Sequence, residues 1–382
     1  MNNTFDDIRP YYDNEIHDAM LRIVQNPLFP KLASFALPDK TLEDAVQLVS
    51  SIDNINDFQM KVMYRAHRRI IEESMSSISY SGLDNVDPSK QYLFVSNHRD
   101  IVLDASLLQA IFVDNGIETT EITFGANLMQ GQLIIDIGKS NKMFRVERPG
   151  GSIREFYNAS KHLSEYIRTT IVDKKQSVWI AQRNGRTKDG IDRTDQGIVN
   201  MFRMSSDSDK VSAITELNII PVSVSYEWEP CDMLKAMELY ISTHHAGTYV
   251  KKDGEDLNSI LTGILQPKGK VHFTICKPVE KEELIPFASL SSNEFNRQVA
   301  SLIDQRICSG YNLTSNNYIA HDLLEGNDVY AAYYTEEQKI AFLKHITHLD
   351  AYSDTCDVEE LKKILLAIYA NPVDSKKQYA DI

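Results

Sequence analysis

Between residues 86 and 285, short apolar runs alternate with helical patterns, and this alternation constrains the fold more than any other feature of the chain. A short apolar run between turn signals is typical of a buried strand, whereas apolar residues spaced three and four apart are typical of a helix. Strands that alternate with helices predict an α/β domain with a mixed, largely parallel sheet flanked by helices. The predicted strands are Tyr92–Val95, Glu121–Phe124, Met143–Val146, Ser177–Ala181, Ile219–Ser225 and Lys270–Cys276. The predicted helices between them are Ile101–Phe112, Gln130–Ile137, Ile153–Val172 and Gly197–Met204.

Helical patterns dominate the two ends of the chain. Few strand signals interrupt residues 1–85, which predicts a helical N-terminal domain. Residues 286–382 return to helical spacing and predict a helical C-terminal extension. We therefore expect three parts, a helical domain over 1–85, an α/β domain over 86–285 and helices over 286–382. The predicted C-terminal helices are Ser292–Cys308, Thr335–Leu349 and Val358–Tyr369.

Charge and cysteine usage exclude several classes of protein. The chain has 382 residues and a formal net charge of -14, so we expect no general affinity for nucleic acid. Its four cysteines lie far apart without a Cys-x-x-Cys pair, which predicts neither a disulfide framework nor a metal site. No apolar run approaches the ~20 residues of a membrane helix, and the acidic start is unlike a signal peptide. These features predict a cytoplasmic protein that is soluble or peripheral on a membrane.

The stretch Phe94–Asp104 offers the first candidate for chemistry. A predicted buried strand ends in Ser96-Asn97, and a predicted helix follows, so His98 and Asp104 lie where a strand gives way to a helix. Reactive groups in α/β sheets are commonly found at such junctions. A His held by a carboxylate can act as a general base toward a hydroxyl. A purely structural His–Asp pair is the competing interpretation, and for an isolated pair it is the commoner one.

Two arginine-bearing strand ends indicate an anionic ligand. The stretch Asn141–Pro149 contains Arg145 and Arg148, whose planar guanidinium groups suit phosphate. The apolar run from Trp179 continues into a loop rich in Gly and Arg. Positive charge concentrated in an otherwise acidic chain favours an anion-binding loop over a merely solvated one, which is the alternative. The candidate residues in this loop are Arg183, Asn184, Gly185, Arg186 and Arg193.

Taken in order, these pieces resemble the four sequence blocks of the glycerophospholipid acyltransferase superfamily. The blocks of that superfamily are Asn-His with a following Asp, Phe-Ile/Val-x-Arg, Glu-Gly-Thr-Arg or a relative, and an Ile/Val-Pro-Val strand. The matches span residues 94–226, with Asn97-His98 first and Ile220-Pro221-Val222 last. A bacterial, soluble-looking branch of the superfamily has similar sequence motifs. The two motifs in this chain are Asn-His-Arg-Asp-Ile-Val-Leu-Asp and Trp-Ile-Ala-Gln-Arg-x-Gly-Arg. Further similarity at Ile8–Tyr11 and Asn371–Val373 extends the resemblance over nearly the whole chain.

Two departures from the superfamily pattern affect the site. Five residues instead of four separate His98 from Asp104, and on a helix the extra residue would rotate the carboxylate by ~100°. Either a local irregularity restores the contact or Asp100 takes the role, and we prefer Asp104 because the bacterial branch shares this spacing. Asn184 stands where the third block usually has Glu, which could alter how the acceptor is held.

The resemblance implies direct acyl transfer without a covalent acyl-enzyme. Asp104 would orient His98, which would take a proton from an acceptor hydroxyl that attacks a thioester carbonyl. Backbone N–H groups near Gly185 or at the helix start after His98 would stabilise the oxyanion. The residues implied to bind the acceptor phosphate or the thioester carrier are Arg145, Arg148, Arg183, Asn184, Gly185, Arg186 and Arg193.

The implied partners are acyl-CoA or acyl carrier protein as donor and glycerol 3-phosphate or a lysophospholipid as acceptor, in phospholipid biosynthesis. No cofactor and no metal are expected. The lipid product makes a peripheral contact with the inner face of the cell membrane a physically sensible expectation. The alternatives are a hydrolase with the same His–Asp pair, a catalytically silent lipid-binding relative, and a phosphoryl-transfer enzyme. The sequence lacks the Gly-x-x-x-x-Gly-Lys-Ser/Thr loop that phosphoryl-transfer enzymes often use.

Overall fold

A seven-stranded sheet forms the centre of the computed structural model, which describes residues 4–147, 151–244, 249, 252 and 254–380. The strand order is β1-β7-β6-β2-β5-β3-β4, and all neighbouring pairs are parallel except β6 with β7. This mixed, largely parallel sheet confirms the predicted α/β fold class. The strands are β1 (Met75–Ser81), β2 (Leu93–Ser96), β3 (Glu121–Gly125), β4 (Met143–Val146), β5 (Val178–Ala181), β6 (Ile219–Tyr226) and β7 (Gly269–Ile275).

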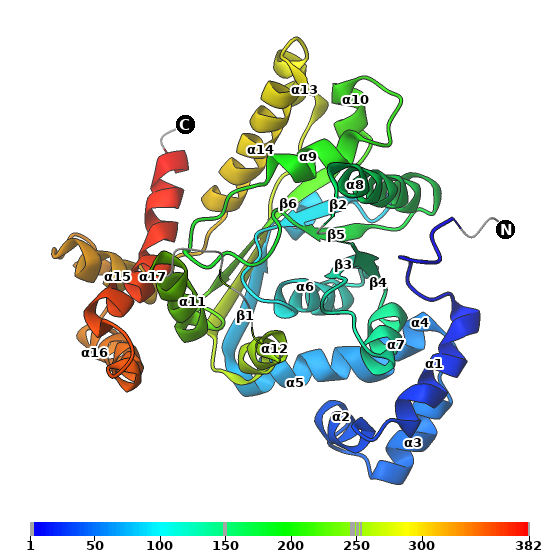
Figure 1. Ribbon diagram of the computed structural model, residues 1–382, viewed down its shortest axis with the longest axis horizontal. Helices are drawn as coiled ribbons and strands as arrows, with labels where there is room; N and C mark the ends of the chain where they lie inside the picture. Colours follow the sequence, from blue (N-terminus) through cyan, green and yellow to red (C-terminus); the bar gives the residue numbers. More distant parts are fainter. Residues whose placement is uncertain (1–3, 148–150, 245–248, 250–251, 253, 381–382) are drawn as a thin grey trace.

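Helices cover both faces of the sheet (Figure 1). One face packs against α8, α9, α10 and α14, and the other against α5, α6 and α7, each through its own apolar cluster. Their bounds are α5 Tyr64–Ser74, α6 Leu103–Asp114, α7 Gln132–Ser140, α8 Ile153–Arg168, α9 Gln196–Arg203, α10 Lys210–Thr215 and α14 Ser292–Ser309. The sheet is therefore buried on both sides, which explains why its central strands are near-continuous apolar runs.

Four helices at the N-terminal end share an apolar cluster of their own, separate from the two beside the sheet. They are α1 (Asp13–Gln25), α2 (Phe29–Ala36), α3 (Leu42–Ser50) and α4 (Ile55–Phe58). The stretch 1–85 also contains β1, a strand that the helical patterns do not predict. β1 is an edge strand with mostly exposed polar side chains, so it lacks the apolar run by which a buried strand is recognised. The division into three domains stays a prediction.

The C-terminal helices and α11 share a further apolar cluster, in which α17 packs against both α11 and α15. They are α11 (Asp232–His244), α15 (Ser315–Glu325), α16 (Glu336–Ile346) and α17 (Val358–Ala380). The α-helices of the described residues are completed by α12 (Glu255–Leu265) and the short α13 (Lys281–Leu284). No helix within the described ranges is both long enough and apolar enough to cross a bilayer.

Strand β2 positions the candidate site. Its residues are fully buried, and Ser96 at its carboxyl end lies in register beside Ala181 of β5 and Val222 of β6. Parallel neighbours bring their carboxyl ends to the same edge of a sheet. The loop after β2 and the arginine-rich loop after β5 therefore lie next to each other, and the Thr187 N–H donates to the His98 carbonyl at 2.7 Å.

Candidate active site

The loop between β2 and α6 brings His98 and Asp104 together. His98 Nδ1 lies 2.9 Å from Asp104 Oδ2, and the Asp104 side chain is fully buried whereas that of His98 is 15% exposed. α6 begins at Leu103, so most of the residues between the pair are not helical. The rotation expected for an extra helical residue therefore does not arise, because the irregular loop makes the contact.

Asp104 accepts hydrogen bonds on both carboxylate oxygens. Oδ2 also accepts from the N–H groups of Arg99, at 2.7 Å, and Asp100, at 3.0 Å. The buried hydroxyl of Tyr226, at the end of β6, donates to Oδ1 at 2.8 Å. Burial and the neighbouring carboxylate charge raise the pKa of Tyr226 far above its usual value, so this hydroxyl remains a donor. These contacts fix the plane of the carboxylate that faces His98.

Asp100 has a different place in the loop. Its Oδ1 accepts from the N–H groups of Val102 and Leu103, both at 2.8 Å, and so satisfies donors at the start of α6. Its Oδ2 is buried without a hydrogen-bond partner among the described residues. Burial and the nearby Asp104 raise the pKa of the Asp100 carboxyl. Asp100 thus holds the helix start, and the carboxylate beside His98 is that of Asp104.

An apolar cavity of about 200 Å³ lies beside His98. The His98 ring meets the buried Trp179 edge-on, with ring centroids 6.0 Å apart. The walls of this cavity are formed by residues of the loops after β2 and β3 and by residues of α8 and α9. The apolar wall residues include Ile101, Phe124, Leu128, Phe156, Leu163, Trp179 and Met201. The cavity can therefore accept an apolar chain whose polar end lies at His98.

A second cavity, of about 400 Å³, adjoins the first and is more polar. The two share Arg183, Asn184 and Asp195 in their walls, and Arg193 lines only the second. Three predicted binding residues therefore meet at one place, where two arginines line the same cavity as Asp189 and Asp195.

The remaining predicted binding residues do not all meet there. Arg145 pairs with Glu147 at 2.6 Å and lines neither cavity, although Glu147 itself lines the apolar one. Arg186 lies near Asp100 and Cys231, and its Nη1 is buried without a hydrogen-bond partner among the described residues. Gly185 has φ +77°, a backbone conformation that favours glycine. Arg148 lies outside the described residues.

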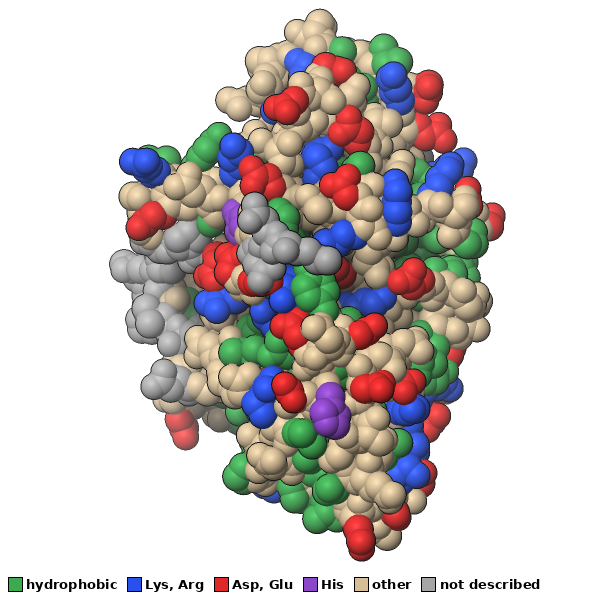
Figure 2. Space-filling view, turned by 90° about the vertical axis from the view of Figure 1, so that its right-hand side faces the viewer, with side chains coloured by type: hydrophobic (Ala, Val, Ile, Leu, Met, Phe, Trp, Pro, Cys, Tyr) green, Lys and Arg blue, Asp and Glu red, His purple; other side chains and the backbone are tan. Residues whose placement is uncertain are grey.

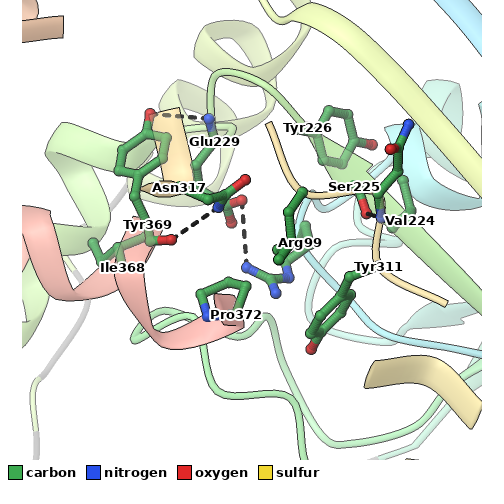
Figure 3. A pocket seen from close by; sticks show the side chains of 12 residues that line it. Arg99, Val224, Ser225, Tyr226, Glu229, Tyr311, Asn317, Ile368, Tyr369 and Pro372 are labelled. Atoms are coloured by element: carbon green, nitrogen blue, oxygen red, sulfur yellow. Dashed lines mark hydrogen bonds and ion pairs between the residues drawn. The ribbon is translucent and has the colours of Figure 1, made fainter. Parts of the chain in front are cut away.

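A buried ionic network contacts the arginine-rich loop between β5 and α9. Arg99 Nη2 donates to Asp192 Oδ2 at 2.7 Å, and Arg99 Nη1 lies 3.4 Å from Glu229, which also pairs with the buried Lys235 at 2.6 Å. Figure 3 shows the Arg99 guanidinium directed at Glu229, with Tyr311 and Pro372 beside it. Further donors to Asp192 are Asn97 at 2.9 Å, Thr187 at 2.6 Å and Tyr311 at 2.6 Å.

Burial alone would make the ionisation of Asp192 unfavourable. The positive charge of Arg99 and the hydrogen bonds from Thr187 and Tyr311 outweigh burial, so the pKa of Asp192 is lowered. The network therefore contains an ionised carboxylate within the protein, and it joins the arginine-rich loop, through Asp192, to Arg99 and Asn97 in the loop after β2.

Sequence analysis did not single out Tyr226, Asp192 or Arg99 as site residues. Tyr226 ends the apolar strand β6, and a polar group at the carboxyl end of a parallel strand is a signal that could have identified it. Arg99 and Asp192 stand inside the recognised stretches but are 93 residues apart, so their pairing cannot be inferred from one sequence.

The surface shows no large basic field on the face drawn in Figure 2, where Lys and Arg side chains are interspersed with Asp and Glu. This pattern agrees with the net charge of -14. The positive groups at the candidate site are therefore a local feature of the strand ends and not part of a basic surface on that face.

Comparisons with known proteins address the same region. Residues 77–225 match the family model described as Acyltransferase. No curated protein matches the chain. Among solved structures, the chain is similar to the crystal structure of the 1-acyl-sn-glycerophosphate (LPA) acyltransferase PlsC from Thermotoga maritima. The sequence identity is 14% and the TM-score 0.34, over 77% of this chain and 95% of that chain.

Proposed function

We propose, from the match of residues 77–225 to the family model described as Acyltransferase, that this chain is an acyltransferase of the glycerophospholipid acyltransferase superfamily. It moves a fatty acyl group from a thioester to a hydroxyl of glycerol 3-phosphate or of a lysophospholipid. The observation that carries this proposal is the position of His98, which is hydrogen-bonded to a buried carboxylate and lies on the wall of an apolar cavity.

His98 acts as the general base. Asp104 accepts from His98 Nδ1, so the nitrogen left for substrate is Nε2. Nε2 takes the proton of the acceptor hydroxyl as its oxygen attacks the thioester carbonyl, and Asp104 stabilises the imidazolium that forms. Collapse of the tetrahedral intermediate releases the thiolate, to which the proton is returned. The acyl chain lies in the apolar cavity during this step.

The oxyanion needs donors that are free of other partners. The N–H groups of Arg99 and Asp100 already donate to Asp104, and those of Val102 and Leu103 donate to Asp100. Most of the helix start after His98 is therefore engaged. The Gly185 N–H makes no hydrogen bond with any residue that the structure describes, and it is the donor we assign to the oxyanion.

The phosphate of the substrate binds at Arg183 and Arg193. Both line the polar cavity, which joins the apolar one at Arg183 and Asn184. A substrate with a phosphate and an apolar chain would thus lie with its reacting group between the two cavities, near His98. Asn184, in place of the usual Glu, offers an amide that can both donate and accept at this junction.

The donor is acyl-CoA or acyl carrier protein, and the pathway is phospholipid biosynthesis. The protein is cytoplasmic, with a peripheral contact at the inner face of the cell membrane where its product is released. No nucleic acid takes part.

The test is release of thiol from palmitoyl-CoA and from palmitoyl acyl carrier protein, with product analysis by mass spectrometry. Release should depend on glycerol 3-phosphate or a lysophospholipid and should yield the matching acylated product. Equal release without an acceptor would instead assign a hydrolase. A lack of release with either donor would reject the proposal in favour of a silent lipid-binding protein.

Tyr226→Phe tests the contact that orients Asp104. Loss of the hydroxyl leaves Asp104 Oδ1 without its donor, and one such hydrogen bond contributes about 1 kcal/mol. We expect kcat to fall about threefold to tenfold while the KM for both substrates stays unchanged. Steady-state kinetics check this, and Tyr80→Phe, which removes an exposed hydroxyl hydrogen-bonded to Asn115, is the control. A change confined to KM would contradict the assigned role of Tyr226.

Arg183→Ala tests the phosphate site. A hydrogen bond to a charged group contributes about 1.5–3 kcal/mol, so the KM for glycerol 3-phosphate should rise roughly tenfold to a hundredfold. The fall in kcat should be smaller, because Arg183 binds and does not react. Arg297→Ala, on the exposed side of α14, should leave both constants unchanged. An unaltered acceptor KM in Arg183→Ala would place the phosphate elsewhere.

A further inference from the structure

The start of α8 presents an apolar surface that no described residue covers. Ile153 is 90% exposed, Phe156 60% and Tyr157 54%. Scattered apolar side chains are normal on a protein surface, but these three are neighbours on one helix face. We call Ile153, Phe156 and Tyr157 the α8 tip.

The α8 tip is continuous with the wall of the apolar cavity. Positions 153, 156, 157, 160 and 163 fall on one helix face roughly 120° wide, at 100° per residue. Farther along this face, Ser160 and Leu163 are half-buried and line the cavity that contains His98. Phe156 belongs to both the α8 tip and the cavity wall, since it is exposed and also lines the cavity. A stripe that is apolar except for Ser160 thus runs along one helix from the surface of the protein to the cavity that contains His98.

We propose that the α8 tip docks on a lipid bilayer, and that lipid chains move along the stripe between the bilayer and the cavity. This inference rests on the proposed function, because it takes the cavity to be the acyl site. A substrate chain that leaves a bilayer along this stripe keeps contact with Ile153, Phe156 and Leu163, which lowers the cost of exposing each methylene to water.

The composition of the tip fits a bilayer interface. An aliphatic side chain beside two aromatic ones is typical of helices that insert shallowly below the headgroups. The only basic residue in the first two turns is Arg154, and the acidic Glu155 is used in the capping box with Ser152. Docking therefore depends on apolar insertion and needs little attraction to anionic lipid, as expected for a chain with net charge -14.

The experiment compares two double variants. Ile153→Ser/Tyr157→Ser removes exposed tip side chains that do not line the cavity. Val329→Ser/Ile340→Ser is the matched control, because both residues are similarly exposed, at 69% and 58%, but lie among the C-terminal helices, on the other side of the molecule from α8 (Figure 1). Binding is measured by flotation with phosphatidylcholine vesicles, with and without phosphatidylglycerol.

The tip variant should bind phosphatidylcholine vesicles at least about tenfold more weakly than the wild type, and the control variant should bind like the wild type. Equal binding by the tip variant, loss in both variants, or wild-type binding that requires phosphatidylglycerol would overturn the proposal. So would a wild-type dimer that the tip substitutions dissociate, since a second copy would then cover the tip.

A reaction without vesicles separates this inference from the proposed function. Transfer from a short-chain acyl-CoA to glycerol 3-phosphate uses only dissolved substrates, and the tip variant should retain it. If the wild type transfers nothing in this assay, the proposed function fails whatever the flotation result. If transfer proceeds but vesicle binding does not depend on the tip, only the docking proposal fails.

Discussion

Replacement of His98 by alanine should lower kcat for acyl transfer by about a hundredfold to ten-thousandfold, the range typical of a lost general base. The acceptor hydroxyl would have no group to take its proton, while the other residues that line the two cavities would remain. The free energy of unfolding should change little, because the only described hydrogen bond of the His98 ring is to Asp104, which keeps three other donors. Thiol release in single turnover and thermal unfolding are the two measurements.

The structure supplies a chemically matched control for this variant. His345 Nε2 pairs with the buried Asp232 at 2.6 Å, and Tyr369 donates to the same carboxylate oxygen at 2.7 Å. This second His–Asp–Tyr set lies among the C-terminal helices and lines neither of the two cavities beside His98. His345→Ala should therefore keep its transfer activity. Comparable activity in a folded His98→Ala protein would refute the assignment of His98 as the base.

Replacement of Asp192 by alanine should have the largest effect on stability. The variant leaves the guanidinium of Arg99 buried without its main partner, and breaking a buried ion pair in this way costs about 3–5 kcal/mol. Urea unfolding gives the loss in free energy. Asp207→Ala removes an exposed carboxylate from the loop between α9 and α10 and should stay within about 0.5 kcal/mol of the wild type.

A double variant tests the cause of that loss. Arg99→Met/Asp192→Leu removes both charges, so no uncompensated charge stays buried, and much of the lost stability should return. Recovery would show that the unpaired charge causes the loss. Failure to recover would point to the hydrogen bonds that Asn97, Thr187 and Tyr311 make to Asp192.

The pH dependence of the Asp192 contribution follows from the direction of its pKa shift. The folded protein lowers the pKa of Asp192, so its stabilising effect is complete above the usual carboxyl value of about 4. The effect is lost as the pH falls through the lowered folded pKa. The difference in unfolding free energy between wild type and Asp192→Ala should therefore be constant from neutral pH to about pH 4 and shrink only below it.

The parts of the fold that the sequence predicts are those with an apolar signal. All six predicted strands are present, and the side chains of the central β2, β5 and β6 are almost all buried. The edge strand β1 is missed because its sequence, Met-Ser-Ser-Ile-Ser-Tyr-Ser, meets solvent over most of its length. Helices α11 and α15 are missed because their buried faces include polar residues such as Asp232 and Asn316.

The candidate site is predictable only where the sequence preserves a motif. The resemblance to a family favoured Asp104 over Asp100 as the partner of His98. The number of residues between them could not decide, because the intervening loop is irregular. The grouping of Arg183 with Arg193 in the wall of the polar cavity, which does not include Arg145, depends on how strand ends meet in three dimensions. No local pattern contains that information.

Helix α17, near the C-terminal end, packs against the arginine-rich loop. The Asn371 side chain donates to the Asp189 carbonyl at 2.7 Å across 182 residues, and a Cβ on Gly190 would overlap the Ile368 carbonyl. During synthesis at 5–20 residues per second, α17 emerges roughly ten to forty seconds after this loop. Until then the loop lacks its contacts with α17. A nascent chain should therefore form its sheet early yet remain unable to bind substrate, and the enzyme should switch on only when translation has passed the last helix.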